Sequence, residues 1–156
     1  DLISACDIRF ATSDSFFSIY EVKIGMAADV GTLQRLPRLI PLGLMKELAY
    51  TGRKMNAEEA VKSGLINAMY KDKSELINNV YKVAKDIAKN SPIAVSGTKQ
   101  IIKYSLNHSI DDGLEYAALW NSSKLQSLDF IEAVKAQIEK REAIFDDILP
   151  TPKLSK

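Results

Sequence analysis

The chain has 156 residues, of which 46% are hydrophobic and 26% charged, a balance typical of one soluble globular domain. Lys and Arg together number 21 against 20 for Asp and Glu, so no basic excess marks a nucleic-acid-binding protein. One cysteine and one histidine exclude a disulfide framework and leave little for a metal site, and no apolar run approaches the roughly 18 residues of a membrane span.

The first third of the chain predicts strands. Two β-rich runs, residues 8–11 ("IRFA") and 16–22 ("FFSIYEV"), are separated by the turn formers "TSDS". Pro37 would end or kink any helix in the segment that follows. Residues 43–52 ("GLMKELAYTG") then predict a short amphipathic helix that is closed by Gly52.

The next segment, "MNAEEAVKSGLINAMY", predicts a helix followed by a strand. Asn56 is a good N-cap, and Glu59 three positions later completes a capping-box pattern. Gly64 supplies the C-terminal stop of the helix. Residues 65–70 ("LINAMY") then indicate a short strand.

From Lys73 the pattern is helical almost without interruption. The Ser-Pro pair at 91–92 combines an N-cap with proline at the first helical position. Ser109 and Asp112 form a second capping-box pattern, and a last helix is expected over residues 130–145. Because the strands come first and the helices afterwards, the sequence indicates an α/β N-terminal part followed by an all-α C-terminal part.

Two carboxylates lie eight positions apart in the largely apolar stretch "EVKIGMAADVGTLQRLP". Carboxylates in an apolar setting must be paired with a cation, be neutralised by protonation, or serve in binding or catalysis. Asp29 could simply cap a following helix, and Glu21 could be a solvated strand-edge residue. The sequence contains no phosphate-binding glycine loop, nucleophile elbow or zinc-spaced histidine pair, so acid–base chemistry by carboxylates is the economical alternative.

Three stretches together resemble the crotonase, or enoyl-CoA hydratase/isomerase, superfamily: "DLISACDIRFATSDSFFSIYEVKIGMAADVGTLQRLPRLI", "AYTGRKMNAEEAVKSGLIN" and "EAVKAQIEKREAIF". The resemblance implies the crotonase fold, a ClpP-like ββα superhelix. Residues 1–70 would be the C-terminal part of its core, and residues 71–156 a helical region for trimerisation and CoA contact. The N-terminal half of the family domain, with the oxyanion-hole donors, would lie outside this sequence, which would then be an inactive fragment by itself.

Within the superfamily, the acidic positions resemble those of the dienoyl-CoA isomerases. Hydratases typically carry glycine in a "P-G-A-G-G-T-Q-R" run where this chain has Asp29. Asp1 and Glu21 match the other two acidic positions of the isomerases. The resemblance implies conversion of 3,5-dienoyl-CoA to 2,4-dienoyl-CoA in fatty-acid β-oxidation, with Glu21 as the C2 base, Asp29 as the C6 acid, and Asp1 tuning ionisation or ordering a water.

The same resemblance extends to binding and assembly. Lys140 and Arg141 match the part of the closing helix that approaches the CoA phosphates, although an exposed "EKRE" face with internal pairing explains them equally well. Tyr116 and Trp120 could anchor a homo-oligomeric interface, a trimer or a dimer of trimers, or could pack internally. No cofactor is expected beyond the CoA of the substrate. The family implies a mitochondrial or peroxisomal location, and the final "LSK" leans slightly towards the peroxisome.

Two alternatives remain open at this point. An enoyl-CoA hydratase or simple enoyl-CoA isomerase of the same fold would not need a carboxylate at Asp29. A truncated, non-catalytic helical module would instead bind intact subunits through the trimerisation surface.

Overall fold

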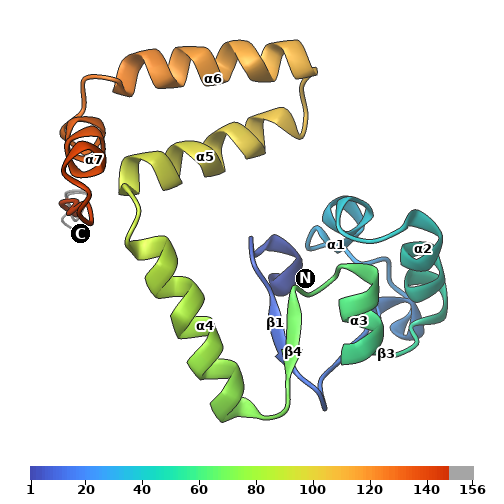
Figure 1. Cartoon of the computed structure of the whole chain (residues 1–156). Helices are drawn as coiled ribbons and strands as arrows, with labels where there is room; N and C mark the ends of the chain where they lie inside the picture. The colour runs from blue at the N-terminus through green and yellow to red at the C-terminus, as the bar shows by residue number, and fades with distance from the viewer. Residues whose placement is uncertain (148–156) are drawn as a thin grey trace, which may run out of the picture. The chain divides into compact units, whose positions relative to one another are not determined.

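The computed structural model describes residues 1–147, so the "LSK" segment lies outside the described residues. The chain forms two compact units, the first from Asp1 to Tyr81 and the second from Lys82 onward, and we refer to them as unit 1 and unit 2. Figure 1 labels the elements of both units.

Unit 1 combines short strands with short helices, several of them of the 3₁₀ type (η). Its elements are η1 (Leu2–Ala5), β1 (Phe10–Thr12), β2 (Phe16–Phe17), η2 (Glu21–Ile24), α1 (Thr32–Arg35), η3 (Leu36–Arg38), α2 (Leu42–Thr51), β3 (Met55–Asn56), α3 (Ala57–Ser63), β4 (Ala68–Tyr70) and the first part of α4 (Lys73–Ala88). Unit 2 contains the rest of α4, then α5 (Pro92–Ser105), α6 (Ile110–Lys124) and α7 (Leu128–Glu139).

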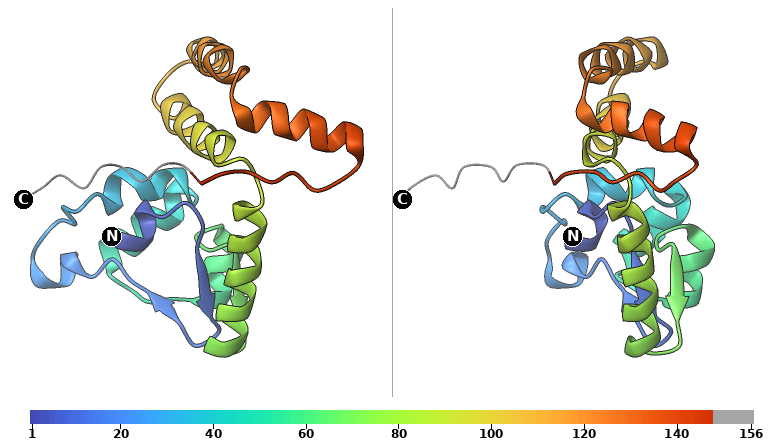
Figure 2. Two further views of the ribbon diagram at one scale, coloured as in Figure 1. Left: turned by 90° about the vertical axis from the view of Figure 1, so that its left-hand side faces the viewer. Right: turned by 60° about the vertical axis from the view of Figure 1, so that its left-hand side comes forward.

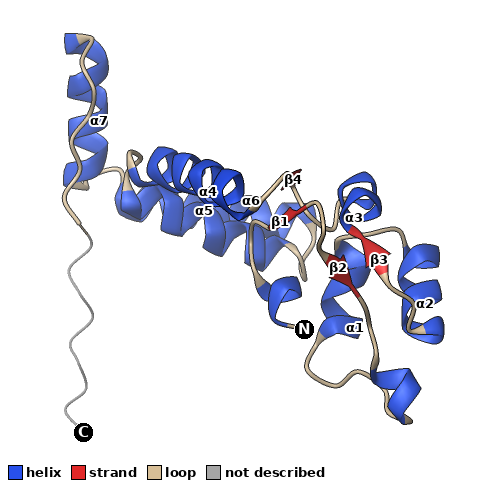
Figure 3. Ribbon diagram, turned by 90° about the horizontal axis from the view of Figure 1, so that it is seen from below, coloured by secondary structure: helices blue, strands red, loops and turns tan. Residues whose placement is uncertain are grey.

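The strands form two small ladders, which Figure 3 shows in red. Strand β1 pairs in parallel with β4, and β2 pairs antiparallel with β3. The strand predicted over residues 16–22 is wrong beyond Phe17, because β3 offers only two residues as a partner. The backbone satisfies itself instead in η2, where the Gly25 N–H donates to the carbonyls of Glu21 and Val22.

The helix predicted after Asn56 is confirmed as α3, but its capping box is only half formed. The Asn56 side chain accepts a hydrogen bond from the Glu59 N–H at 2.8 Å. The Glu59 carboxylate does not return to the Asn56 backbone, because it accepts two hydrogen bonds from the Arg53 guanidinium. Gly64 ends the helix in the left-handed conformation, as predicted.

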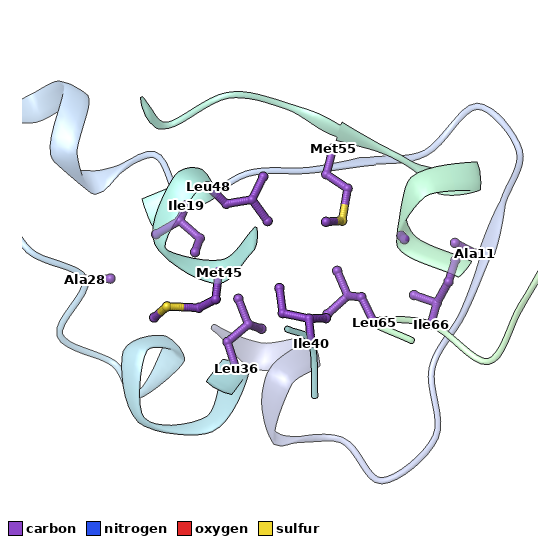
Figure 4. Packing of buried hydrophobic residues seen from close by; sticks show 11 residues of the cluster. Ala11, Ile19, Ala28, Leu36, Ile40, Met45, Leu48, Met55, Leu65 and Ile66 are labelled. Atoms are coloured by element: carbon purple, nitrogen blue, oxygen red, sulfur yellow. The ribbon is translucent and has the colours of Figure 1, made fainter. Parts of the chain in front are cut away.

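The hydrophobic core of unit 1 brings together side chains from β1, β2, β3, α1, η3, α2, α3 and the loops between them (Figure 4). Met55 is its largest fully buried side chain. Ile19, Ala28 and Met45 lie together at one end of the cluster, and Ala11 and Ile66 lie at the other. Segments far apart in the sequence are therefore held by common apolar burial.

Unit 2 confirms two of the predicted helix starts and corrects one helix end. Ser91 caps α5, and Ser109 forms a capping box with Asp112 at the start of α6. The last helix ends at Glu139 rather than near 145, because Lys140 adopts the left-handed conformation with φ 54°.

Helices α5 and α6 pack against each other, and Figure 1 shows them side by side. The contact is close because Trp120 lies against Gly97, where a Cβ atom would stand 2.2 Å from the indole Nε1. The Tyr116 ring stacks on Tyr104 with centroids 4.3 Å apart. Both aromatic residues that the sequence offered as interface anchors thus have packing partners inside unit 2.

Replacing Gly97 by alanine is expected to destabilise the α5–α6 pair by about 1–3 kcal/mol, because the indole must move away from the added methyl group. Trp120 is the only tryptophan, so its fluorescence during urea unfolding measures the change directly. Gly43→Ala is the matched control, since a Cβ there meets nothing within 4 Å. Equal midpoints for the two variants would contradict the expectation.

Among the described residues, none of the helices combines the length and apolar character that crossing a membrane requires.

Candidate active site

Helix η2 and the loop that joins it to α1 carry the two carboxylates that the sequence singled out in its apolar stretch: Glu21 is the first residue of η2, and Asp29 lies in the loop. Glu21 follows the buried Ile19 by two positions, and Asp29 directly follows the buried Ala28. Because Ile19 and Ala28 lie at the same end of the core cluster, the two carboxylates are attached to one anchored edge of unit 1 (Figure 4).

Local backbone geometry shapes this segment. Gly25 and Gly31 both adopt positive φ, at 78° and 94°, and so mark the two ends of a loop over residues 25–31. The Met26 N–H donates to the Glu21 carbonyl at 3.0 Å, which ties the start of the loop to η2. Figure 2 shows η2 and this loop in light blue at the periphery of unit 1.

The Asp29 carboxylate is exposed and does not cap α1, so that alternative interpretation of the sequence is wrong. The N-cap of α1 is Gly31, and no side chain accepts a hydrogen bond there. Within residues 1–147, neither Asp29 nor the half-buried Glu21 has a side-chain hydrogen bond or ion pair. Both carboxylates are therefore free to meet another molecule or another segment.

Asp1, in contrast, is firmly held. The Thr32 hydroxyl donates a short hydrogen bond to the Asp1 carboxylate. The Ser4 hydroxyl donates to the Asp1 carbonyl at 2.6 Å, and Ser4 in turn accepts from the Arg35 guanidinium at 2.9 Å. Asp1 also lines a small cavity of about 50 Å³, together with apolar side chains that include Phe17 and Leu36.

Exposed apolar side chains surround the two unpaired carboxylates along the chain. They are Tyr20, Val22, Ile24, Met26 and Val30. Nearby, Phe17 packs partly against the core, whereas Phe16 is exposed. Exposed apolar side chains next in the chain to carboxylates without partners suit a ligand that is mostly hydrocarbon.

The structure groups the predicted site residues unequally. Asp1, Glu21 and Asp29 all belong to unit 1, where Asp1 lines the cavity and the other two lie on the η2 and 25–31 segment. Lys140 and Arg141 belong to unit 2, directly after α7.

Arg141 is committed to contacts within the chain. Its guanidinium donates to Glu132 at 2.5 and 3.0 Å and to Glu139 at 2.6 Å. Glu132 also accepts from the Ile144 N–H, so it ties the segment after α7 back to the helix. The Lys140 side chain is exposed and, among the described residues, has no hydrogen-bond or ion-pair partner.

The Arg141 guanidinium, helped by the Ile144 N–H, lowers the pKa of Glu132 from 4.5 to about 2. A carboxylate whose pKa is lower in the folded state contributes stability above its unfolded pKa and loses it as the pH falls. Between about pH 4.5 and pH 2 we therefore expect the contacts of the segment after α7 to open. Side-chain NMR titration of Glu132 checks this, and a midpoint near 4.5 would contradict it.

Sequence reasoning missed Ser4, Thr32 and Arg35. The available signal was weak: Ser4 stands three positions after Asp1, and Thr32 and Arg35 are one helical turn apart inside the "GTLQR" run. No group of three or more potential metal ligands occurs in the part of the chain that the structure describes.

The family model described as enoyl-CoA hydratase/isomerase matches residues 1–148. The chain is 50% identical to the mitochondrial Δ(3,5)-Δ(2,4)-dienoyl-CoA isomerase of Rattus norvegicus over 144 residues, which are 92% of this chain and 44% of the rat protein. It is 47% identical to the peroxisomal enzyme of that name from Arabidopsis thaliana, over 93% of this chain and 52% of the plant protein.

Among solved structures, an enoyl-CoA hydratase from Mycobacterium tuberculosis shares the fold with a TM-score of 0.88 at 34% identity, over 93% of this chain and 57% of that one. These likenesses confirm the resemblance and the crotonase fold that the sequence indicated. The chain spans about half the length of the curated relatives it matches.

Proposed function

The chain belongs to the enoyl-CoA hydratase/isomerase family, and on that premise we propose that it forms the acid-bearing part of an enzyme that isomerises 3,5-dienoyl-CoA to 2,4-dienoyl-CoA in fatty-acid β-oxidation. The observation that carries the proposal is the Asp29 carboxylate, exposed and without a partner among the described residues. Several relatives at 42–50% identity bear the name of this isomerase.

The reaction moves two conjugated double bonds one position toward the thioester. Glu21 takes a proton from C2, and the electron pair left behind delocalises over the thioester oxygen, C2, C4 and C6. Asp29 then delivers its proton to C6, which completes the product with no net gain or loss of atoms. Glu21 now holds a proton and Asp29 is ionised, so proton exchange with water restores the starting state.

The described geometry supports this division of labour. C2 and C6 are separated by four bonds, so a single carboxyl cannot easily reach both carbons. Glu21 and Asp29 leave one edge of the core on two separately anchored segments, with apolar side chains around them. Asp1 is held by Thr32 and Ser4, which suits a residue that orders a water or adjusts the charge of the site without transferring the proton itself.

A chimera tests the proposal, because the chain covers only part of each relative. This chain would replace the matched 144 residues of the rat isomerase. We expect addition of a 3,5-dienoyl-CoA to produce the ultraviolet absorbance of a diene conjugated with the thioester carbonyl. The unmodified rat enzyme is the positive control, and circular dichroism confirms that the chimera folds.

An enoyl-CoA hydratase activity is the second candidate, because the chain is 34% identical to the short-chain-enoyl-CoA hydratase of Clostridium acetobutylicum over 91% of its length. The same chimera decides between them. Hydration of 2-enoyl-CoA without conversion of the dienoyl substrate would overturn the isomerase assignment. A folded chimera without either activity would favour a non-catalytic module.

We further propose that Lys140 contacts the phosphates of CoA, since Arg141 is already paired and Lys140 is not. Among residues 1–147, Lys140 is the one non-glycine residue with positive φ, at 54°. Lys140→Gly should therefore stabilise the end of α7 by about 1 kcal/mol while weakening CoA binding about tenfold. Urea unfolding and calorimetric titration with CoA measure the two effects, and unchanged CoA affinity would remove Lys140 from the site.

The remaining expectations about the whole protein are proposals too. Residues 1–70 would complete the catalytic core, residues 71–156 would carry CoA contacts and assembly into a trimer or dimer of trimers, and no cofactor would be needed. Leu128 and Ile138 of α7 are each 76% exposed, which supports an apolar face available for assembly. The names of the relatives support a mitochondrial or peroxisomal location.

A further inference from the structure

We propose that Arg35 is a positioning residue for this reaction: it holds the Asp1 segment and the Asp29 loop in one fixed arrangement. The buried Ser4 is its partner, and the buried Thr32 holds the Asp1 carboxylate beside it. The proposal rests on the proposed function and names a residue that acts through Asp1 and Asp29.

One guanidinium connects the two acid-bearing segments. Its Nη2 donates to the Val30 carbonyl at 2.8 Å, one residue after Asp29, and to the Asp1 carbonyl at 3.2 Å. Its Nε donates to the Ser4 hydroxyl at 2.9 Å. The planar guanidinium, which stays charged, thus binds three acceptors on two segments. The Asp1 segment and the 25–31 loop cannot shift independently without breaking a hydrogen bond.

The two residues whose hydroxyls hold Asp1 are buried. Ser4 and Thr32 are 6% and 5% exposed, and they are the buried polar residues of the described chain. A buried hydroxyl is costly unless it is hydrogen-bonded, and both of these hydroxyls donate to Asp1. Both buried hydroxyls therefore serve to hold Asp1, a residue of the proposed site.

Gly31 makes room for the guanidinium. A Cβ atom at that position would stand 2.2 Å from Arg35 Nη1, so any larger residue would displace the side chain. The Thr32 hydroxyl is bonded to Asp1 Oδ1, and Asp1 lines the small cavity, so the carboxylate is fixed beside that space.

The position of the 25–31 loop matters because Asp29 must reach C6 of the same bound chain from which Glu21 takes the C2 proton. A misplacement of about 1 Å at a catalytic group can cost about 100-fold in rate. A loss of Arg35 would leave Asp1 and Asp29 present but no longer fixed in position, which lowers turnover more than it lowers substrate binding.

The test compares Arg35→Ala and Arg35→Lys in the rat chimera, with Arg53→Ala as the control. Arg53 is also a half-buried arginine that bridges two carboxylates, Glu47 and Glu59, but it contacts no acid-bearing segment of the site. We expect kcat to fall about 100-fold in both Arg35 variants with KM changed less than about threefold. Added guanidinium ion should restore part of kcat in Arg35→Ala, and Arg53→Ala should retain full activity.

Hydrogen exchange on the 156-residue chain alone provides a second measurement that needs no activity. Amides of residues 25–31 should exchange faster in Arg35→Ala and unchanged in Arg53→Ala. If the parent chimera fails to turn over dienoyl-CoA, the proposed function fails, and the exchange experiment still decides the positioning role. Unchanged amide exchange in residues 25–31 of Arg35→Ala would overturn the positioning role. So would a rise in KM as large as the fall in kcat, without recovery of kcat by added guanidinium ion.

Discussion

Replacing Asp29 by asparagine is expected to lower turnover of 3,5-dienoyl-CoA in the chimera by about 10²–10⁴-fold, the usual contribution of a positioned acid or base. Asparagine keeps the shape of the side chain but cannot deliver a proton to C6. Glu21→Gln should cause a loss of the same order, because it removes the proposed base for the C2 proton. Neither change should lower stability, since neither carboxylate has a partner among residues 1–147.

The two variants also separate the two steps. With Glu21 intact, Asp29→Asn should still exchange the C2 proton with deuterated solvent, whereas Glu21→Gln should not. Asp14→Asn is the matched control, an exposed aspartate in the "TSDS" turn. Full activity in Asp29→Asn would remove the reason for preferring the isomerase over the hydratase.

Replacing Gly31 by alanine is expected to lower the free energy of unfolding by about 3 kcal/mol, the largest stability effect foreseen outside the core. Part of the cost is the left-handed backbone at φ 94°, which disfavours any Cβ. The rest follows from the displaced guanidinium of Arg35, which would leave the buried Ser4 and the Val30 carbonyl without their donor. Urea unfolding followed by circular dichroism measures the total.

Gly25→Ala is the matched control for the backbone contribution. Gly25 has a similar φ of 78°, but a Cβ there meets nothing within 4 Å. Gly25→Ala should cost about 1 kcal/mol, so the difference between the variants isolates the displacement of Arg35. In the double variant Gly31→Ala with Arg35→Ala, the two losses should not add. Strict additivity would show that the guanidinium and the glycine are not coupled.

Sequence reasoning was most accurate where the interactions are local. Gly52 and Gly64 close their helices in the left-handed conformation, and Ser91 and Ser109 cap the starts of α5 and α6, as predicted. Each of these interactions joins backbone and side-chain groups within about four positions, so the residues that decide it stand together in the sequence.

The errors arose where a partner comes from elsewhere in the chain. The run at 16–22 has the composition of a strand, but β3 pairs with only two of its residues. Glu59 matches a capping box, yet Arg53 offers it two charge-assisted hydrogen bonds. Composition cannot show how long a partner strand is or which cation a carboxylate will meet.

The sequence by itself determined the family and the order of strands and helices, and it predicts the acidic site positions 1, 21 and 29, because those properties follow from residue types at fixed spacings. Only the tertiary structure decided how the acids are held. The bonds from Thr32 to Asp1 and from Arg35 to Ser4 each span 31 positions. They exist because α1 packs beside η1, an arrangement that apolar burial over the whole of unit 1 produces and that no local pattern encodes.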